Sequence, residues 1–219
     1  MTQLHLKPIP ALSDNYIWLL EDDAGNALVV DPGEAQPVID ELHRRQLQLR
    51  AILLTHHHPD HIGGVEALCK SAEVDIYAPD DPRIDIATHR VAHGDHVKIL
   101  NPQCAFDVIG VPGHTSSHIA FHGNGMLFCG DTLFSVGCGR LFEGTPEQML
   151  TSLDRLAALP GDTEVCCGHE YTVANCVFAQ SIDSKNIILD ARLEAARALR
   201  AEGKPSVPSR LVDELACNP

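Results

Sequence analysis

The stretch Thr55-His56-His57-His58-Pro59-Asp60-His61 follows directly on the apolar run Ala51-Ile52-Leu53-Leu54. The apolar run is typical of a buried strand, so the pattern His-x-His-x-Asp-His stands where that strand ends. Imidazole and carboxylate groups are ligands that zinc, iron and manganese accept in proteins. Four such ligands within six residues are hard to arrange around one tetrahedral ion, so the stretch indicates more than one metal ion.

The order of residues in this stretch predicts two groups of ligands. His56 and His58 are two residues apart, so their side chains point the same way on an extended segment. A proline then bends the chain, which allows Asp60 and His61 to face a neighbouring ion. His57 alternates with its neighbours and is expected to point away from the metals.

Further residues of ligand type stand at or just after strand-like segments, namely Asp31, His114, Asp131 and His169. Loops at strand ends are where a rigid scaffold carries binding and catalytic groups. One histidine or aspartate in such a place is usually a surface or capping residue. Together with the first stretch, however, five histidines and two aspartates besides Asp31 predict a metal centre. The remaining histidines are interpreted as surface or core residues, although His118 follows His114 by the spacing of one helical turn.

The composition describes a globular protein and excludes several classes of partner. The chain has 219 residues, 44% of them apolar, which suits one large domain or a core domain with an appendage. Its formal net charge of −14 argues against a nucleic-acid partner, which needs clustered Lys and Arg. No stretch approaches the roughly 20 apolar residues of a membrane span, and the N-terminus lacks the features of a secretory signal. Eight scattered cysteines without a Cys-x-x-Cys pair favour reduced thiols, and a cytoplasmic monomer is expected.

Alternating segments predict two sheets with helices outside, followed by a helical region. Apolar runs predict strands over residues 16–20, 27–30, 51–55, 106–111, 119–122, 126–129 and 164–167. Helical spacing predicts helices over residues 37–42 and after the glycine pair at 63–64. Thr145-Pro146-Glu147-Gln148 combines a cap, a proline at the first position and a glutamine three residues after the cap, so it begins another helix. From about Tyr171 onward only helices are expected.

Four motifs resemble those that mark the metallo-β-lactamase superfamily, namely Thr55-His56-x-His58-x-Asp60-His61, Pro112-Gly113-His114-Thr115, Gly130-Asp131-Thr132 and Gly168-His169. Within that superfamily the chain resembles the glyoxalase II, or hydroxyacylglutathione hydrolase, family over nearly its whole length. The narrower resemblance is carried by Asp14-Asn15-Tyr16-Ile17-Trp18, Val30-Asp31-Pro32-Gly33, Leu133-Phe134-Ser135, Gly137-Cys138-Gly139-Arg140-Leu141-Phe142-Glu143-Gly144 and Cys167-Gly168-His169-Glu170-Tyr171-Thr172.

The resemblance implies an α/β fold, an αββα sandwich of the metallo-β-lactamase type over residues 1–169, followed by a short helical substrate-binding region over residues 170–219. It also implies two divalent ions, with zinc preferred over iron or manganese. Of the seven implied ligands, His56, His58 and His114 would hold one ion, Asp60, His61 and His169 would hold the other, and Asp131 would bridge them. Asp31 would orient a ligand histidine, and Arg140, Phe142 and Tyr171 would contact glutathione.

The implied reaction is hydrolysis of an S-(2-hydroxyacyl)glutathione, such as S-D-lactoylglutathione, to glutathione and D-lactate in the detoxification of methylglyoxal. Two close cations lower the pKa of a shared water from about 15.7 to near 7, and the resulting hydroxide attacks the thioester carbonyl. Asp60 and Asp131 are the implied catalytic residues, and Asp60 would orient the nucleophile or take its proton. A thiol with a pKa of about 8.5 leaves readily without a general acid, which fits a thioester better than an amide.

Some positions depart from the family pattern and leave alternatives open. Phe142 stands where many relatives have tyrosine, and Ser117 and Val136 replace glycines. Relatives continue beyond the position of Pro219 with basic residues that contact glutathione, so residues 170–219 are expected to be a truncated or naturally short form. A glutathione-independent thioesterase or lactonase and a single-iron persulfide dioxygenase are therefore kept as alternatives. The acidic charge disfavours a nuclease of the superfamily, and the complete ligand set disfavours a non-catalytic binding protein and a single-metal enzyme.

Overall fold

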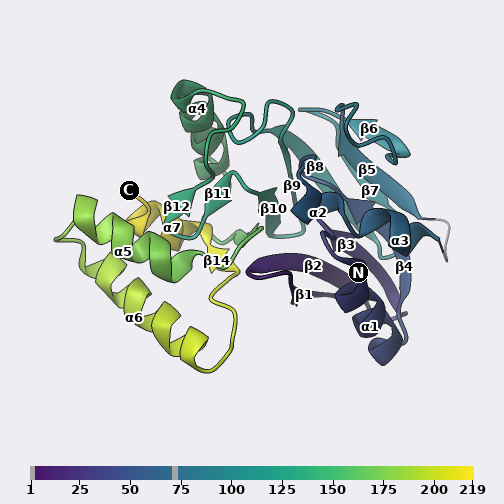
Figure 1. Ribbon diagram of the computed structural model, residues 1–219, viewed down its shortest axis with the longest axis horizontal. Coiled ribbons are helices and arrows are strands. Elements are labelled where there is room, and N and C mark those ends of the chain that lie inside the picture. The colour runs from purple at the N-terminus through teal and green to yellow at the C-terminus, as the bar shows by residue number, and fades with distance from the viewer. Residues whose placement is uncertain (1–2, 71–73) are drawn as a thin grey trace. The chain divides into compact units, whose positions relative to one another are not determined.

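The computed structural model describes residues 3–70 and 74–219, so Met1 and Thr2 of the N-terminal stretch lie outside the described residues (Figure 1). The chain divides into two compact units. Unit 1 comprises Met1–Gly110 and Ser117–Asn124, and unit 2 comprises Val111–Ser116 and Gly125–Pro219. Each unit contributes its own strands, helices and apolar core, and each is described by itself.

Unit 1 contains a six-stranded sheet whose strands lie side by side in chain order. They are β1 (Leu4–Ala11), β2 (Asn15–Asp22), β3 (Asn26–Val30), β4 (Gln48–Leu53), β5 (Asp75–Pro79) and β6 (His89–Val91). The first three strands pair antiparallel, and β3 to β6 pair parallel. Pro8 and Pro10 have no amide hydrogen to donate, and they are tolerated in β1 because it is an edge strand.

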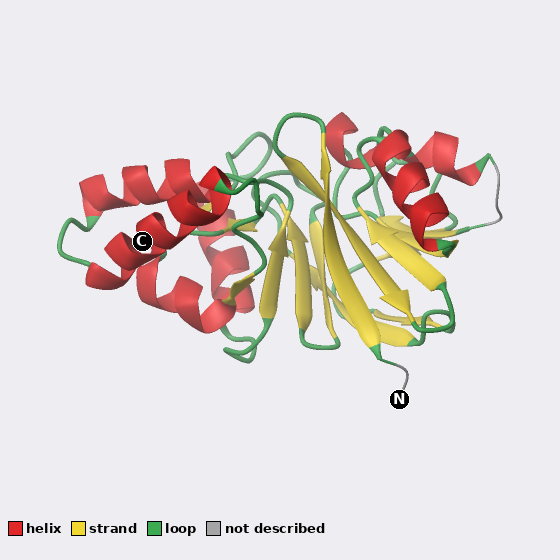
Figure 2. Cartoon of the chain, turned by 90° about the horizontal axis from the view of Figure 1, so that it is seen from below, coloured by secondary structure: helices red, strands yellow, loops and turns green. Residues whose placement is uncertain are grey.

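Three helices accompany this sheet, α1 (Ala35–Arg45), α2 (Pro59–Ile62) and α3 (Val65–Cys69). Figure 2 shows helices α1 to α3 in red on one side of the yellow strands of unit 1. Val38 of α1 and Leu68 of α3 join Leu19 and Ile52 of the sheet in one buried apolar cluster. Burial of these side chains removes apolar area from water, which is the main force that holds the helices on the sheet. Unit 1 also contains the antiparallel strands β7 (His96–Ile99), β8 (Cys104–Gly110) and β9 (Ile119–Gly123).

Unit 2 combines short strands with four helices of the C-terminal half. In it, β10 (Met126–Gly130) pairs parallel with β13 (Glu164–Cys167), which pairs antiparallel with β14 (Ser209–Arg210). β11 (Leu133–Phe134) and β12 (Gly137–Cys138) form a small antiparallel ribbon. The helices are α4 (Pro146–Ala157), α5 (Thr172–Ile182), α6 (Ile187–Ala201) and α7 (Leu211–Cys217). A second buried cluster joins the ribbon to α5, α6 and α7, and it consists of Val136, Cys176, Ala179, Leu189, Leu193 and Cys217.

Most of the predicted elements are present, and the predicted start of α4 is confirmed in detail. Thr145 and Gln148 form a reciprocal capping box, in which each side chain accepts from the other residue's amide. The strand predicted over 51–55 is displaced, because β4 spans Gln48–Leu53. It ends early since the Thr55 amide donates to the Asp31 side chain rather than to a neighbouring strand.

Other differences concern short or edge strands. The expectation that only helices follow Tyr171 is wrong, because β14 pairs with β13. This strand has two residues, too few to produce a recognisable period. Four further strands, β1, β5, β6 and β7, have no predicted counterpart. β1 contains two prolines, which are unusual in a strand, and the other three strands are short and partly exposed.

Two further sequence-based expectations concern the cysteines and the membrane. All eight cysteines are free, and six of them are buried, whereas Cys138 is exposed. Within residues 3–70 and 74–219 we find no helix that is both long and apolar enough to cross a membrane.

Candidate metal centre

The first cluster of ligand-type side chains belongs to unit 1 and lies between β4 and the end of α2. The ring centroid of His56 lies 4.7 Å from that of His58 and 4.2 Å from that of His61. His61 Nε2 lies 3.6 Å from Asp60 Oδ2. His56 and His61 are 0% and 1% exposed, so an ion that they held would be shielded from bulk water. The four ligands predicted in this stretch thus lie together.

Asp31, in the loop after β3, forms hydrogen bonds with two residues of this stretch. Its Oδ1 accepts the Thr55 amide at 2.8 Å, and its Oδ2 accepts the Thr55 hydroxyl at 2.7 Å. Oδ2 also lies 3.0 Å from His61 Nδ1. Because Nδ1 donates in this bond, Nε2 is left as the ligand atom of His61, and Nε2 is the atom near Asp60. Gly33 permits the close packing of these loops, because a Cβ there would lie 1.8 Å from the Asp60 carbonyl oxygen.

Two residues without a predicted role contact this cluster. Asn15 Nδ2 donates to Asp60 Oδ2 at 3.0 Å and fixes the carboxylate. His118, which the sequence places among the surface or core histidines, stacks on His56 with ring centroids 4.5 Å apart and an interplanar angle of 17°. Signals for both existed in the sequence, since Asn15 belongs to a family-typical segment and His118 lies four residues after His114. Neither signal specifies a partner.

His57 has a partner outside the cluster. Its Nδ1 lies 3.5 Å from Asp81 Oδ2. Asp81 is buried and also accepts the Ser117 hydroxyl at 2.5 Å and Arg83 Nε at 2.8 Å. The hydrogen-bonded Arg83 guanidinium holds the pKa of the Asp81 carboxyl well below its usual range. His57 therefore lies beside the ion pair of Asp81 and Arg83.

The second cluster of ligand-type side chains belongs to unit 2. His114 follows Gly113, Asp131 follows β10, and His169 follows β13. Asp131 Oδ2 lies 3.4 Å from His114 Nε2 and 3.3 Å from His169 Nε2. All three residues are buried. One carboxylate oxygen is therefore flanked by two imidazole nitrogens.

The ring of His114 is held by the loop after β12. Its Nδ1 donates to the Arg140 carbonyl at 2.7 Å, which directs Nε2 toward Asp131. The Phe142 amide donates in turn to the His114 carbonyl at 3.2 Å. Gly139 makes this arrangement possible, because a Cβ there would lie 1.8 Å from the Asp131 carbonyl oxygen.

The three predicted substrate contacts also lie in unit 2. Arg140 and Phe142 are exposed, and the guanidinium carbon of Arg140 lies 5.9 Å from the centroid of the Phe142 ring. A cation held over a ring face in this way is attracted by the ring quadrupole. Tyr171 stacks on His169 with ring centroids 4.7 Å apart and an interplanar angle of 5°. The Phe142 ring thus supports the Arg140 guanidinium and has no hydroxyl to donate.

Both clusters fit divalent metal ions of the zinc type in their donor chemistry. Imidazole nitrogen and carboxylate oxygen bind Zn²⁺ at about 2.0–2.2 Å, so two such ligands on one tetrahedral ion lie about 3.3–3.6 Å apart. The distances of 3.3, 3.4 and 3.6 Å between Nε2 and Oδ2 atoms match that separation. These three distances are longer than ordinary N–H···O hydrogen bonds, which reach about 3.2 Å. Ligand histidines whose Nδ1 donates to a carbonyl or carboxylate are also typical of metal sites.

Comparison with known families supports the fold. A family model of the metallo-beta-lactamase superfamily matches residues 12–97 and 106–169. A second model, hydroxyacylglutathione hydrolase C-terminus, matches residues 170–219. The two matches meet at the boundary predicted for the two domains, and the division into a catalytic domain and a substrate-binding region stays a prediction.

Similar proteins and structures include close and more distant relatives. The chain is 53% identical to a hydroxyacylglutathione hydrolase of Xylella fastidiosa over 99% of its own length and 83% of the relative's. It is 54% identical to the protein of that name from Methylobacillus flagellatus, over 97% of its own length and 84% of the relative's. Among solved structures, it matches the BLEG-1 B3 metallo-beta-lactamase with a TM-score of 0.69 and 30% identity, over 75% of this chain and 91% of that one. ETHE1 from Myxococcus xanthus matches with a TM-score of 0.68 and 31% identity, over 76% of each chain. These likenesses confirm the predicted α/β fold of the metallo-β-lactamase type with a C-terminal helical region.

Proposed function

Because the chain belongs to the metallo-beta-lactamase superfamily and, within it, to the hydroxyacylglutathione hydrolase family, we propose that it is a thioester hydrolase acting on S-(2-hydroxyacyl)glutathione. Water and a substrate such as S-D-lactoylglutathione give glutathione and a 2-hydroxy acid, here D-lactate. The physiological result is removal of methylglyoxal. The proposal draws its main support from identity above half over nearly the whole chain to relatives of that name.

The proposed cofactor is a pair of divalent ions, Zn²⁺ before iron or manganese. His56, His58 and His114 would hold one ion, Asp60, His61 and His169 would hold the other, and Asp131 would contribute to both. The carboxylate oxygen of Asp131 lies at 3.3 and 3.4 Å from two imidazole nitrogens, which supports a bridging role. A bound pair of such ions supplies Lewis acidity and lowers the pKa of water toward about 7.

The residues of the chain prepare the attack on the thioester. Asp60, fixed by Asn15 at 3.0 Å, orients the attacking water and accepts its proton. The water oxygen bonds to the thioester carbonyl carbon, and the carbon–sulfur bond then breaks. The glutathione thiolate leaves without a protein acid, since its conjugate thiol has a pKa of about 8.5. Burial of His56, His61 and Asp131 excludes bulk water from the reacting groups.

The proposed glutathione contacts are Arg140, Phe142 and Tyr171. Arg140 is exposed and its guanidinium is supported by the Phe142 ring, so it is available to pair with a carboxylate of the tripeptide. Tyr171 lies against His169 and joins the substrate contacts to the ligand set. We further propose that the protein acts in the cytoplasm as a monomer, with the glutathione thioester as its partner and without nucleic-acid or membrane partners.

A parallel assay of two thioesters tests the proposed reaction. The purified protein would be offered S-D-lactoylglutathione and the lactoyl thioester of N-acetylcysteamine, with zinc, iron and manganese counted in the same sample. We expect kcat/KM to be at least tenfold higher for the glutathione thioester, with two metal ions per chain. Equal rates would establish a glutathione-independent thioesterase instead. Oxygen consumption with glutathione persulfide and one iron per chain would establish the dioxygenase alternative.

A further inference from the structure

The turn between β11 and β12 contains a residue in an unfavourable backbone conformation. Val136 has φ of +59°, in the left-handed region that β-branched residues avoid because the branched Cβ crowds the backbone. Its side chain is 1% exposed and packs in the cluster with Cys176 and Leu193. Water therefore does not contact this side chain, and neighbouring groups of the protein must stabilise the strained backbone.

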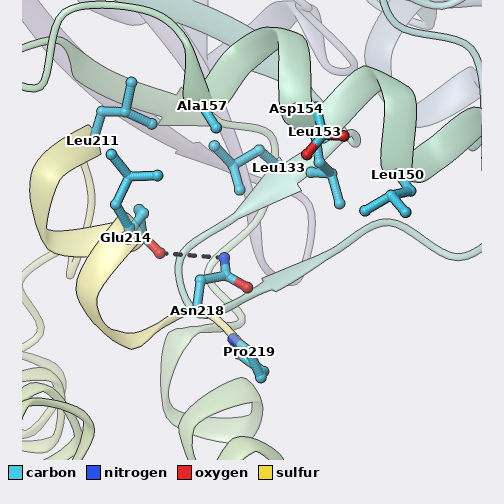
Figure 3. Close-up of a pocket in the computed structure, with 10 residues that line it drawn as sticks. Leu133, Leu150, Leu153, Asp154, Ala157, Leu211, Glu214, Asn218 and Pro219 are labelled. Atoms are coloured by element: carbon cyan, nitrogen blue, oxygen red, sulfur yellow. Dashed lines mark hydrogen bonds between the residues drawn. The ribbon is translucent and has the colours of Figure 1, made fainter.

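Side chains from three C-terminal helices bind this turn. Glu214 of α7 accepts the Val136 amide on its Oε2 at 2.7 Å. Asn218, which ends α7, donates to the carbonyls of Phe134 and Gly137 at 3.1 and 3.2 Å. Asn175 of α5 donates to the Ser135 carbonyl at 3.1 Å. Arg192 of α6 donates to the Ser135 hydroxyl oxygen at 2.8 Å. Figure 3 shows Glu214 and Asn218 joined by a dashed line on the side of α7 that faces Leu133 of β11.

The same turn is connected to the candidate metal centre and substrate contacts of unit 2. Phe134, at its start, packs edge-on against His169 with ring centroids 5.9 Å apart and against Tyr171 at 5.2 Å. At its end, the Gly139 amide donates to the Thr132 carbonyl at 3.1 Å. The next residue is Arg140, whose carbonyl orients His114. A change in the turn would therefore displace the segment that contains Arg140.

We propose that Glu214 is a positioning residue for substrate binding, which acts by holding Val136 in the left-handed conformation. Glu214 is 2% exposed, and its carboxylate binds the amide of the strained residue itself. A buried hydrogen bond of 2.7 Å to this side-chain oxygen can offset part of the backbone strain. Through the turn, α7 sets where Arg140 lies. The kinetic consequence rests on the proposed hydrolase function, whereas the structural one does not.

Two matched backgrounds test this role. Val136→Gly and Val136→Ala both remove the buried isopropyl group, but only glycine adopts positive φ without strain. Glu214→Ala would be introduced into the wild type and into both backgrounds. We expect it to raise KM for S-D-lactoylglutathione at least tenfold in the wild type and in Val136→Ala, with a smaller change in kcat. In Val136→Gly we expect KM to rise less than threefold, because the turn no longer needs the carboxylate.

Unfolding measurements on the same variants make the test independent of activity. Glu214→Ala should raise the unfolding equilibrium constant less in Val136→Ala than in Val136→Gly, by up to about tenfold, because loss of the hydrogen bond lets the strained alanine turn relax, and glycine has no such strain to relieve. Glu214→Gln retains an acceptor oxygen and should keep KM near that of the wild type, as should Asp213→Ala, an exposed neighbour on α7. Equal Glu214→Ala effects on unfolding in the two backgrounds would overturn the proposal. A wild type that does not hydrolyse the thioester would refute the proposed function alone, because the unfolding comparison would still decide the role of Glu214.

Discussion

Asp31 shows how one side chain can orient a proposed metal ligand. It is 4% exposed and serves two Thr55 donors and His61 Nδ1 at once. An Asp31→Asn amide must direct its NH2 at one of these donors, which loses an acceptor and leaves a buried donor unsatisfied. We expect metal affinity to fall about 10- to 100-fold, as for other partners of ligand histidines. Zinc titration against a chelating dye measures the change. Asp23→Asn, an exposed aspartate near the same sheet, is the control, and an unchanged affinity in Asp31→Asn would contradict the orienting role.

Arg140 has one observed contact and one proposed role, and a single substitution separates them. Its carbonyl orients His114, and this contact survives any change of side chain. Its exposed guanidinium lies over the Phe142 ring and takes no part in the contact with His114. Arg140→Ala should therefore raise KM for the glutathione thioester about tenfold or more with a smaller change in kcat, as expected for a ground-state binding contact. Steady-state kinetics beside Arg197→Ala, an exposed arginine of α6, provide the comparison. An equal loss in kcat and in kcat/KM would move Arg140 into the chemistry.

The Asp81 network predicts a defined dependence of stability on pH. Arg83 lowers the pKa of this carboxyl in the folded state below the value of about 3.9 that an unfolded chain has. A group with a lowered folded pKa contributes stability that is present above the unfolded pKa and is lost as pH falls through the folded value. The difference in unfolding free energy between the wild type and Asp81→Asn should therefore be constant near neutrality. It should shrink as pH falls below about 4, which denaturant titrations at several pH values would measure. A difference that grows toward acid pH would show that another group dominates.

At the scale of elements, α4 supports the loop that carries His114. Ser152 of α4 donates to the Pro112 carbonyl at 2.7 Å, and a Cβ on Gly113 would lie 3.0 Å from the backbone of Met149. The helix begins in a capping box, so Thr145→Ala leaves first-turn amides unsatisfied and should cost about 1 kcal/mol of unfolding free energy. Thr151→Ala, an exposed position of the same helix, should cost less than about 0.5 kcal/mol. Chemical denaturation compares the two, and equal losses would show that the cap is not the source.

The elements that the sequence predicts are those whose local pattern agrees with their burial. β2, β3 and β10 are buried along nearly their whole length and appear as continuous apolar runs. α4 is marked by its cap. The sequence does not predict β1 and β14, because an edge strand tolerates proline and a two-residue strand depends on its partner β13. Partner-dependent elements have no local signature.

The candidate site also contains residues with a local sequence signal and residues that depend on a distant partner. The ligand-type residues are visible in sequence because their chemistry is unusual at strand ends, and each cluster lies together in its own unit. The sequence assigns no role to Asn15, His118 or Glu214. An amide, a stacked ring and a turn-binding carboxylate have their effect only through a partner distant in sequence. Long-range contacts of this kind are properties of the fold and not of any motif.

At the scale of the whole molecule, the ligand set links metal binding to stability. Buried imidazoles and carboxylates that hold an ion stabilise the folded chain by binding free energy, which the unfolded chain lacks. Removal of metal with a chelator should therefore lower Tm, and a ligand present at 1,000 times its Kd accounts for about 4 kcal/mol. Adding back zinc, iron or manganese in turn should restore Tm in the order of affinity. His58→Ala, which removes one ligand, should show a smaller chelator-induced shift than the wild type and a lower metal content. His5→Ala, a half-exposed histidine outside both clusters, should match the wild type. If chelation leaves Tm unchanged in a protein that is shown to have contained metal, the clusters do not hold that metal.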